Sequence, residues 1–302
     1  MRLVILSENT PSPEGLAGEH GLSLAVYLDD GSMWLWDAGA SGLAAQNAAA
    51  LHVDLAQAVG LALSHGHYDH TGGIAAFLEA GFDGPIFAHQ GSTTPRWAVK
   101  PGSATRPIGW EKPEPVRGRI RPVEGTTVLA TDGQGNPVLT MVTDIPRLPG
   151  NAEHVDNFFH DSIGERPDCV LDDACLVLHT PRGRVLVLGC CHSGLANTLA
   201  AVDAATAYAT HPGSAGGPAE ASADNADSTA TPGFECVLGG LHLMGVTDAD
   251  DPAILQALDA LKRYGVRSLR PGHCTGSLAG RVLAERFPGP VELLHVGAVI
   301  EL

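Results

Sequence analysis

Three histidines and one aspartate are crowded into a short segment that reads Ser64-His65-Gly66-His67-Tyr68-Asp69-His70-Thr71-Gly72-Gly73. Imidazole and carboxylate groups are ligands that zinc prefers, and manganese and iron also accept them. The apolar run at 59–63 predicts a buried strand, and the apolar residues 74–78 predict the start of a helix. A histidine-rich surface loop is the alternative. The density of ligand-type side chains at a strand end favours a metal site.

The composition indicates a large globular core and an acidic surface. The chain has 302 residues, of which 44% are hydrophobic, and a net charge of −16. This charge argues against nucleic acids and anionic membranes as partners. It leaves an anionic small-molecule substrate possible, because a metal pair or a few arginines reverse the sign of the potential locally.

The sequence carries no signal for a membrane span or for secretion. Its apolar stretches are shorter than the ~20 residues of a membrane helix, and the start of the chain does not have the pattern of a signal peptide. The six cysteines are irregularly spaced and do not predict a disulfide framework. We therefore expect a cytoplasmic protein, with no indication of its oligomeric state.

Strands and helices are predicted in two similar halves, each with histidine-bearing loops at strand ends. Strands are expected at 3–6, 23–28, 33–36, 59–63, 86–88, 175–179, 184–188, 236–238, 266–269 and 291–300, and helices at 43–52, 72–80, 253–264 and 277–287. This order favours a single α/β (α+β) domain, 1–302, built as a four-layer αββα sandwich.

Two segments interrupt this pattern. Residues 92–125 are rich in proline and arginine and show little periodicity, so they are predicted to be either a lid over an anionic ligand or a mobile surface insertion. Residues 202–232 are rich in small and polar residues, which predicts a disordered insertion, although the preceding helix is expected to reach as far as Tyr208.

Two further histidines are the best candidates to complete the ligand set. His192 and His273 each lie in a glycine-flanked loop directly after an apolar strand. His242 has a similar position but lies between two leucines, which favours a contact with substrate or with a ligand over direct metal binding. His20, His89 and His154 have less local support.

The segment from His65 to His70 resembles the His-x-His-x-Asp-His signature of the metallo-β-lactamase superfamily. The resemblance implies the αββα fold and two metal ions, zinc being the first candidate and manganese or iron the alternatives. It assigns His65, His67 and His192 to one ion, and Asp69, His70 and His273 to the other.

Further motifs are similar to the branch of this superfamily related to the synthase of ribofuranosyl-aminobenzene phosphate in methanopterin biosynthesis. They are Glu19-His20-Gly21-Leu22-Ser23, Asp37-Ala38-Gly39, Ile108-Gly109, Asp144-Ile145-Pro146-Arg147, Asp172-Asp173-Ala174, Gly189-Cys190-Cys191-His192-Ser193-Gly194, Gly240-Leu241-His242-Leu243 and His273-Cys274-Thr275-Gly276. One departure concerns Cys190, because other hydrolases of the superfamily place a metal-bridging aspartate near this position. Cys190 is therefore either a bridging thiolate, a small buried residue, or a sign that a single metal ion is bound.

Three functions are compatible with these residues. The first is hydrolysis of a small anionic ester by metal-activated water, with Asp69 orienting the nucleophile and His242 donating to the developing charge. The second is a synthase or transferase reaction, with phosphate contacts from Arg96, Arg106 and Arg147. The third is a metal- or ligand-binding regulatory role without turnover, and iron would add the possibility of redox chemistry. The substrate itself is not indicated, because one fold and metal core serve many reactions.

Overall fold

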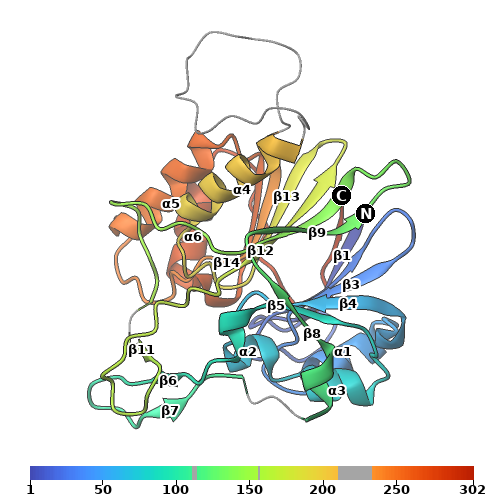
Figure 1. Ribbon diagram of the computed structural model, residues 1–302. Coiled ribbons are helices and arrows are strands. Elements are labelled where there is room, and N and C mark those ends of the chain that lie inside the picture. Colours follow the sequence, from blue (N-terminus) through green and yellow to red (C-terminus); the bar gives the residue numbers. More distant parts are fainter. Residues whose placement is uncertain (111–113, 156, 210–232) are drawn as a thin grey trace.

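Two β-sheets pack face to face, with helices on both outer sides, in the computed structural model of the chain (Figure 1). It describes residues 1–110, 114–155, 157–209 and 233–302. In spatial order the seven-stranded sheet contains β16 (Val299–Glu301), β1 (Arg2–Ser7), β2 (Ser23–Tyr27), β3 (Met33–Trp36), β4 (Ala58–Ala62), β5 (Ile86–His89) and β8 (Ile120–Val123). The six-stranded sheet contains β15 (Ser268–Gly272), β14 (Phe234–Gly240), β13 (Gly183–Leu188), β12 (Cys175–Thr180), β10 (Pro137–Val142) and β9 (Thr126–Thr131).

The helices divide between the two outer faces (Figure 1). The seven-stranded sheet carries α1 (Leu43–Ala50), α2 (Tyr68–Thr71) and α3 (Ile74–Glu79). The six-stranded sheet carries α4 (Leu195–Ala209), α5 (Pro252–Arg263) and α6 (Ser277–Arg286). Short 3-10 helices are η1 (Leu55–Gln57), η2 (Gln90–Thr93), η3 (Glu114–Arg119) and η4 (His273–Thr275). No helix in the described ranges combines the length and apolarity that a membrane crossing requires.

The alternation of side chains along the strands produces the four layers. In β13, Val185 and Val187 belong to the core between the sheets, whereas Leu186 and Leu188 belong to the core under α4, α5 and α6. Successive side chains of a strand point to opposite faces, so a strand that is apolar throughout is buried on both. The strand β1 divides in the same way between the inner core and the core under α1 and α3. The predicted αββα sandwich is confirmed.

A tryptophan joins the two sheets next to the strand ends that carry the histidine loops. The Trp36 side chain at the end of β3 is fully buried. Its indole N–H donates to the carbonyl oxygen of Leu188 at the end of β13, across 3.2 Å. A buried indole N–H needs such a partner, and the bond therefore fixes the two strand ends relative to each other.

The strands that precede the histidine loops run parallel within each sheet. β3, β4 and β5 are parallel neighbours, as are β13, β14 and β15. The carboxyl ends of parallel strands lie at the same edge of a sheet. Loops that are far apart in the sequence are thereby brought to one side of the sandwich.

Several predicted boundaries were wrong. Residues 92–125 are not one long loop: β8 pairs with β5, while β6 (Trp97–Ala98) and β7 (Arg106–Pro107) form a small sheet with β11 (Phe158–Phe159). The C-terminal strand covers only β16, and Val291 forms a single bridge to Leu269. The strands β9 and β10 were missed. Residues 202–209 belong to α4, as far as was anticipated, and residues 210–232 of the predicted disordered insertion lie outside the described residues.

Candidate metal centre

Four histidine loops leave the ends of strands at the same side of the sandwich. The loop after β4 carries His65, His67 and His70, and the ends of β13, β14 and β15 lead to His192, His242 and His273. Three positions in these loops have left-handed backbone conformations, with φ of 60° at Cys191, 47° at His242 and 48° at His273. Such conformations cost about 1–2 kcal/mol for a non-glycine residue, so the surrounding contacts must hold them.

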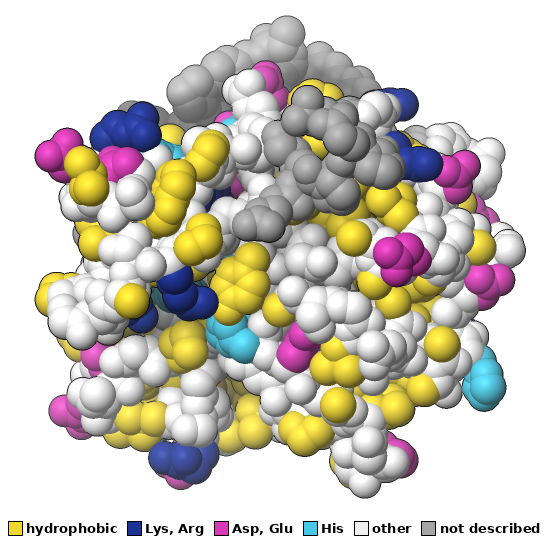
Figure 2. Space-filling view, turned by 90° about the horizontal axis from the view of Figure 1, so that it is seen from below, with side chains coloured by type: hydrophobic (Ala, Val, Ile, Leu, Met, Phe, Trp, Pro, Cys, Tyr) yellow, Lys and Arg dark blue, Asp and Glu magenta, His cyan; other side chains and the backbone are white. Residues whose placement is uncertain are grey.

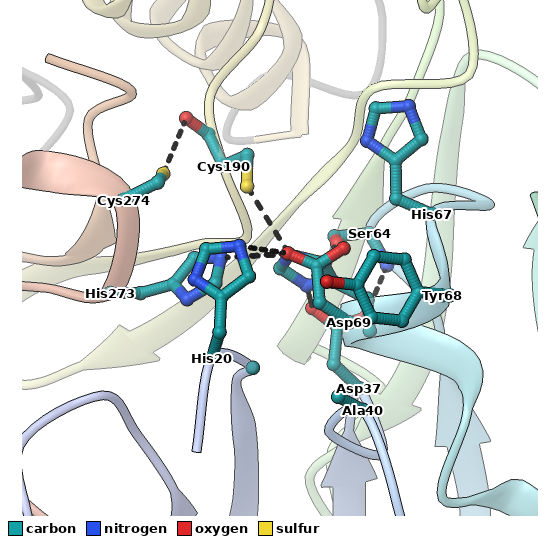
Figure 3. A network of polar contacts seen from close by, with 12 residues as sticks. His20, Asp37, Ala40, Ser64, His67, Tyr68, Asp69, Cys190, His273 and Cys274 are labelled. Carbon is teal, nitrogen blue, oxygen red and sulfur yellow. Dashed lines mark hydrogen bonds and ion pairs between the residues drawn. The ribbon is translucent and has the colours of Figure 1, made fainter. Parts of the chain in front are cut away.

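The first ligand set combines donors from both sheets (Figure 3). Potential ligand atoms of Asp69, His70, Cys190 and His273 lie within 4.8 Å of one another, and all four residues are buried. The Nε2 atoms of His70 and His273 are 3.1 Å apart, and Asp69 Oδ2 is 3.4 Å from His273 Nε2. His70 Nε2 is 3.2 Å from Cys190 Sγ. The geometry therefore gathers four metal-binding groups around one point.

A second set adjoins the first. Ligand atoms of His65, Cys190 and His192 also lie within 4.8 Å of one another. His67 packs against this set: its Nδ1 is 3.0 Å from His65 Nε2, and its ring centroid is 5.0 Å from that of His192. In Figure 3 the imidazole of His67 points away from the Asp69 carboxylate. Five of the six predicted metal-binding residues are thus brought together in two neighbouring sets that share Cys190, and the sixth, His67, packs beside the second set.

Hydrogen bonds on the far side of the rings orient the histidines. His70 Nδ1 lies 2.6 Å from Asp37 Oδ2, His273 Nδ1 lies 3.0 Å from Asn9 Oδ1, and His192 Nδ1 lies 2.5 Å from the carbonyl oxygen of His154. Each of these partners accepts a hydrogen bond from Nδ1, which leaves the Nε2 side of each ring directed at the centre. This arrangement of a ligand histidine and an outer acceptor is common at metal sites.

The chemistry of the donor set fits a divalent cation. His67 Nε2 and His192 Nε2 are buried and have no hydrogen-bond partner within the described part of the chain. The Nε2 atoms of His70 and His273 face each other at 3.1 Å, an arrangement in which two lone pairs repel unless a cation or a proton lies between them. Buried polar groups without a partner are costly. A zinc-like ion would satisfy these atoms together.

The pKa values of the ligand residues differ between the two sets. Burial, together with the neighbouring histidines, holds the pKa values of His65 and His192 well below the ordinary range, so both rings are neutral. Burial opposes the charge on His70, but Asp37 and Asp69 outweigh it and raise its pKa to about 9. Burial would also raise the pKa of Asp69, yet His70, His20 and His273 hold it well below its usual range. The centre therefore contains a carboxylate and a position where positive charge is stabilised.

A cavity of about 440 Å³ opens onto this centre. Its lining includes Asp69, Cys190 and His242 at the metal side, Phe158 among its apolar residues, and the basic residues Lys100 and Arg106. Figure 2 shows basic, histidine and hydrophobic side chains that adjoin around a hollow on one face of the molecule. A small ligand with an anionic end and an apolar part matches such a lining.

The three predicted phosphate-binding arginines have different surroundings. Arg106 lines the cavity, and its guanidinium is 5.5 Å from the centroid of the Tyr68 ring. Arg96 is buried in ion pairs with Asp168 and Asp172 and is not among the residues that line this cavity. Arg147 pairs with Glu153 at 2.7 Å and is likewise absent from the lining. The geometry therefore retains Arg106 as a candidate substrate contact and gives Arg96 and Arg147 structural partners.

His242 lies on the cavity wall beside the second ligand set. Its ring centroid is 4.3 Å from that of His192, and its backbone N–H donates to Cys274 Sγ at 3.3 Å. Burial opposes protonation of His242, but the contact with Cys274 outweighs it and raises the pKa of the imidazole. This position suits a proton donor to a bound ligand.

Asp172 and Asp173 hold the two loops that supply the second set. From the sequence, these aspartates had been assigned no role in the site. Asp172 Oδ2 accepts a hydrogen bond from the backbone N–H of Gly66 at 2.8 Å, between His65 and His67. Asp173 Oδ2 accepts one from the N–H of Ser193 at 2.7 Å, directly after His192. Both carboxylates are buried. These two consecutive residues therefore fix both loops, the one with His65 and His67 and the one with His192.

Asp37 was also missed as a site residue. Its Oδ1 accepts from the N–H of Ser64 at 2.7 Å, and its Oδ2 lies against His70. A signal was present, since Asp37 directly follows an apolar strand, as the histidine loops do. His20 had been given little support. Its Nε2 lies 3.2 Å from Asp69 Oδ2, and its side chain is 43% exposed toward the cavity that it lines.

The αββα sandwich and the paired histidine sets define a class of protein. The chain belongs to the metallo-β-lactamase superfamily, whose family model matches residues 18–214. It is similar to 7,8-dihydropterin-6-methyl-4-(beta-D-ribofuranosyl)-aminobenzene-5'-phosphate synthase of Methanocaldococcus jannaschii, with 27% identity over 248 residues that cover 79% of this chain and 74% of the relative. Both resemblances inferred from the sequence are thereby confirmed.

Solved structures agree on the fold. Tm1679, a metal-dependent hydrolase of the beta-lactamase superfamily, matches with a TM-score of 0.75 and 24% identity over 100% of this chain and 99% of that chain. YhfI from Bacillus subtilis, a metallo-beta-lactamase fold protein, matches with a TM-score of 0.52 and 12% identity over 100% of this chain and 98% of that one. At these identities the likeness concerns the fold.

Proposed function

We propose that this protein is a metal-dependent hydrolase of a small anionic ester, with a phosphoester as the favoured class and two zinc ions as the cofactor. The observation that carries the proposal is the cavity that joins the buried ligand sets to Lys100 and Arg106. A positive wall beside a metal centre favours an anionic ligand even in a chain whose net charge is −16.

One ion would be held by His65 and His192 of the second set together with the adjoining His67, and the other by Asp69, His70 and His273 of the first set. When bound, divalent ions polarise a phosphoryl oxygen and lower the pKa of water towards ~7. Oxygen and imidazole ligands also admit manganese or iron, but the thiol of Cys190 in both sets favours zinc over the harder ions.

Side chains of the cavity would bind the substrate, orient the water and donate a proton. Lys100 and Arg106 would bind the anionic group and orient the ester. Asp69 stays ionised at neutral pH because of its histidine neighbours, so it would accept a hydrogen bond from the attacking water. His242, whose pKa the contact with Cys274 raises, would donate a proton to the leaving oxygen.

A substrate panel tests this function. Zinc-loaded protein would be assayed with a phosphomonoester, a phosphodiester and a neutral lactone, each in wild type and in Arg106→Ala. We expect a phosphoester to be the best substrate, and KM for it to rise about tenfold in the variant, as one lost ionic hydrogen bond implies. KM for the lactone should not change. Arg121→Ala is the matched control, because Arg121 lines a separate hollow with Asp83 and Phe87.

A transferase is the second candidate, because the M. jannaschii relative is a synthase of a ribofuranosyl-aminobenzene phosphate. The same cavity, with Phe158 and the two basic residues, would suit a phosphorylated sugar and an aromatic amine. Incubation with a ribosyl diphosphate donor and an aminobenzoate, followed by mass analysis, separates the candidates. A condensed product would replace the hydrolase proposal, whereas metal retention without turnover of any of these compounds would favour a regulatory metal- or ligand-binding protein.

A further inference from the structure

Cys190 is the residue that the two ligand sets have in common. Its Sγ lies within 4.8 Å of ligand atoms of Asp69, His70 and His273, and also within 4.8 Å of those of His65 and His192. The side chain is 2% exposed, and Sγ is 3.2 Å from His70 Nε2. Figure 3 shows the sulfur directed toward the region of Asp69 and His273. No other residue belongs to both sets, among the residues that the structure describes.

We infer that Cys190 is a metal ligand shared by both ions, a thiolate in the place where a carboxylate would otherwise bridge them. This inference rests on the metal-binding part of the proposed function and is independent of the reaction that the ions support.

The local chain direction supports a ligand role over simple packing. The next residue, Cys191, is equally buried but belongs to the apolar core under α4 and α5, where its Sγ is 3.5 Å from Thr198 Oγ1. Cys191 adopts φ of 60°, a left-handed conformation. With Cys191 turned into the core, Cys190 and His192 on either side of it both reach the centre. The backbone strain thus accompanies an arrangement that delivers a sulfur and an imidazole together.

A thiolate at Cys190 would supply negative charge that two divalent ions need in this buried site. Among the residues of the two sets, Asp69 is the only carboxylate, and the four histidines beside it are neutral ligands when they bind a cation. Two divalent ions bring four positive charges into a buried site, so Asp69 alone leaves strong repulsion between them. A thiolate placed between the ions adds a second negative charge at the position where it acts on both. Its proton would be released to water on metal binding, as for other cysteine ligands.

Buried nitrogen atoms provide an independent sign that the sulfur faces cations. Among the described residues, His192 Nε2 has no hydrogen-bond partner, and it belongs with Cys190 to the second set. A sulfhydryl is a weak donor and does not satisfy several imidazoles at once. A cation between Cys190 Sγ and the imidazole nitrogens of the second set would give each of these atoms a partner.

Cobalt substitution tests the inference without an activity measurement. Metal-free protein would be titrated with Co²⁺, and the near-ultraviolet charge-transfer band of a thiolate–cobalt bond would be recorded. We expect the band to grow through the first and the second equivalent, because the same sulfur contacts each ion in turn. In Cys190→Ser the band should disappear, and in the matched control Cys191→Ser it should persist at full intensity.

Two further variants keep the outcome interpretable. Cys274→Ser separates the other nearby thiol, because Cys274 Sγ forms a third group with Cys190 and His242. Cys190→Asp should bind two cobalt ions without the band, which also covers the case that the serine variant does not fold. A band that stops growing after one equivalent, that survives in Cys190→Ser, or that depends on Cys274 would each overturn the shared-ligand assignment.

Discussion

The carboxylate of Asp172 connects the buried Arg96 to the metal loop, the segment 64–73 that carries His65, His67, Asp69 and His70. Loss of this carboxylate should lower both the stability of the fold and the affinity for metal. One oxygen accepts the Gly66 N–H at 2.8 Å, and the other pairs with the guanidinium of Arg96. Arg96 is 2% exposed and retains Asp168, whose Oδ2 is 3.1 Å from its Nε. We consider Asp172→Asn, which preserves shape and removes the charge.

The expected loss of stability follows from the buried arginine. Breaking a buried pair by removal of one partner costs about 3–5 kcal/mol in the free energy of unfolding. Because Asp168 remains, we expect the lower end, about 3 kcal/mol. For a chain of 302 residues, with an unfolding entropy of about 2.1 cal/mol/K per residue, that corresponds to a fall in Tm of about 5 °C.

Metal affinity should fall as well, because the single amide oxygen of asparagine cannot accept from both Arg96 and the Gly66 N–H, and the buried guanidinium favours that oxygen on its own side. Substitution of a group that orients ligands typically weakens metal binding about 10- to 100-fold. Competition with a chromophoric chelator measures this quantity directly, and thermal unfolding of the metal-free protein measures stability separately. The two measurements together distinguish a loosened loop from a loosened fold.

Asp168→Asn is the matched control for this experiment. It removes a charge from the same arginine, and Asp168 Oδ1 accepts a hydrogen bond from the N–H of Val170 at 2.8 Å, away from the metal loop. We expect a similar fall in Tm with unchanged metal affinity. If Asp168→Asn weakened metal binding as much as Asp172→Asn, or if Asp172→Asn kept full affinity, the anchoring role of Asp172 would be refuted.

Three other predictions concern the same centre. His273→Ala should lose at least one metal ion per chain by elemental analysis, whereas His242→Ala should retain its full content; an emptied site in the second variant would make His242 a ligand. Asp173→Ala should weaken chelator-resistant metal binding, while Asp173→Asn, which keeps an acceptor for the N–H of Ser193, should lose less; equal losses would contradict this. Burial lowers the pKa of His67 from 6.5 to about 3, so the unfolded chain alone takes up a proton in this window. The free energy of unfolding of the metal-free protein, measured by urea titration, should therefore fall as pH drops below 6.5, by about 1.4 kcal/mol per pH unit, with a shallower slope in His67→Gln.

The metal loop was predictable because its signal is local. Four ligand-type residues follow one apolar strand within a few positions, and the same strand-end position marked His192 and His273. Parallel pairing of β13, β14 and β15 then brings the later loops together. Strand periodicity and the position of a residue after its strand carried enough information for both steps.

The supporting carboxylates were not predictable in the same way. Asp172 contacts Gly66, 106 positions earlier, and Arg96, 76 positions earlier. Arg96 was expected to face substrate because a basic residue in an irregular, proline-rich segment resembles a lid residue. Its burial depends on two aspartates that arrive from a distant part of the chain. Pairings of this kind are set by tertiary structure and leave no local pattern.

The missed strands have a similar explanation. β9 lies at the edge of its sheet and is half-exposed, so its residues, from Thr126 to Thr131, mix apolar and polar types without a clear alternation. β8 contains Pro122 and pairs with β5 at the edge of the other sheet. Edge strands tolerate proline and polar residues, because one side of their backbone does not pair. Their sequences therefore resemble loops.

The donors of the centre come from both sheets, so metal binding and sheet packing are thermodynamically linked. The loop after β4 supplies Asp69 and His70, and the other sheet supplies Cys190 and His273. Neither sheet alone presents a complete set. The hydrogen bond from the Trp36 indole to the carbonyl oxygen of Leu188 joins the end of β3 to the end of β13, the strand that leads to Cys190. An ion that binds only when the sheets are packed adds its binding free energy to that packing. A substitution in the inner core that shifts one sheet against the other must therefore weaken metal binding, even where it touches no ligand.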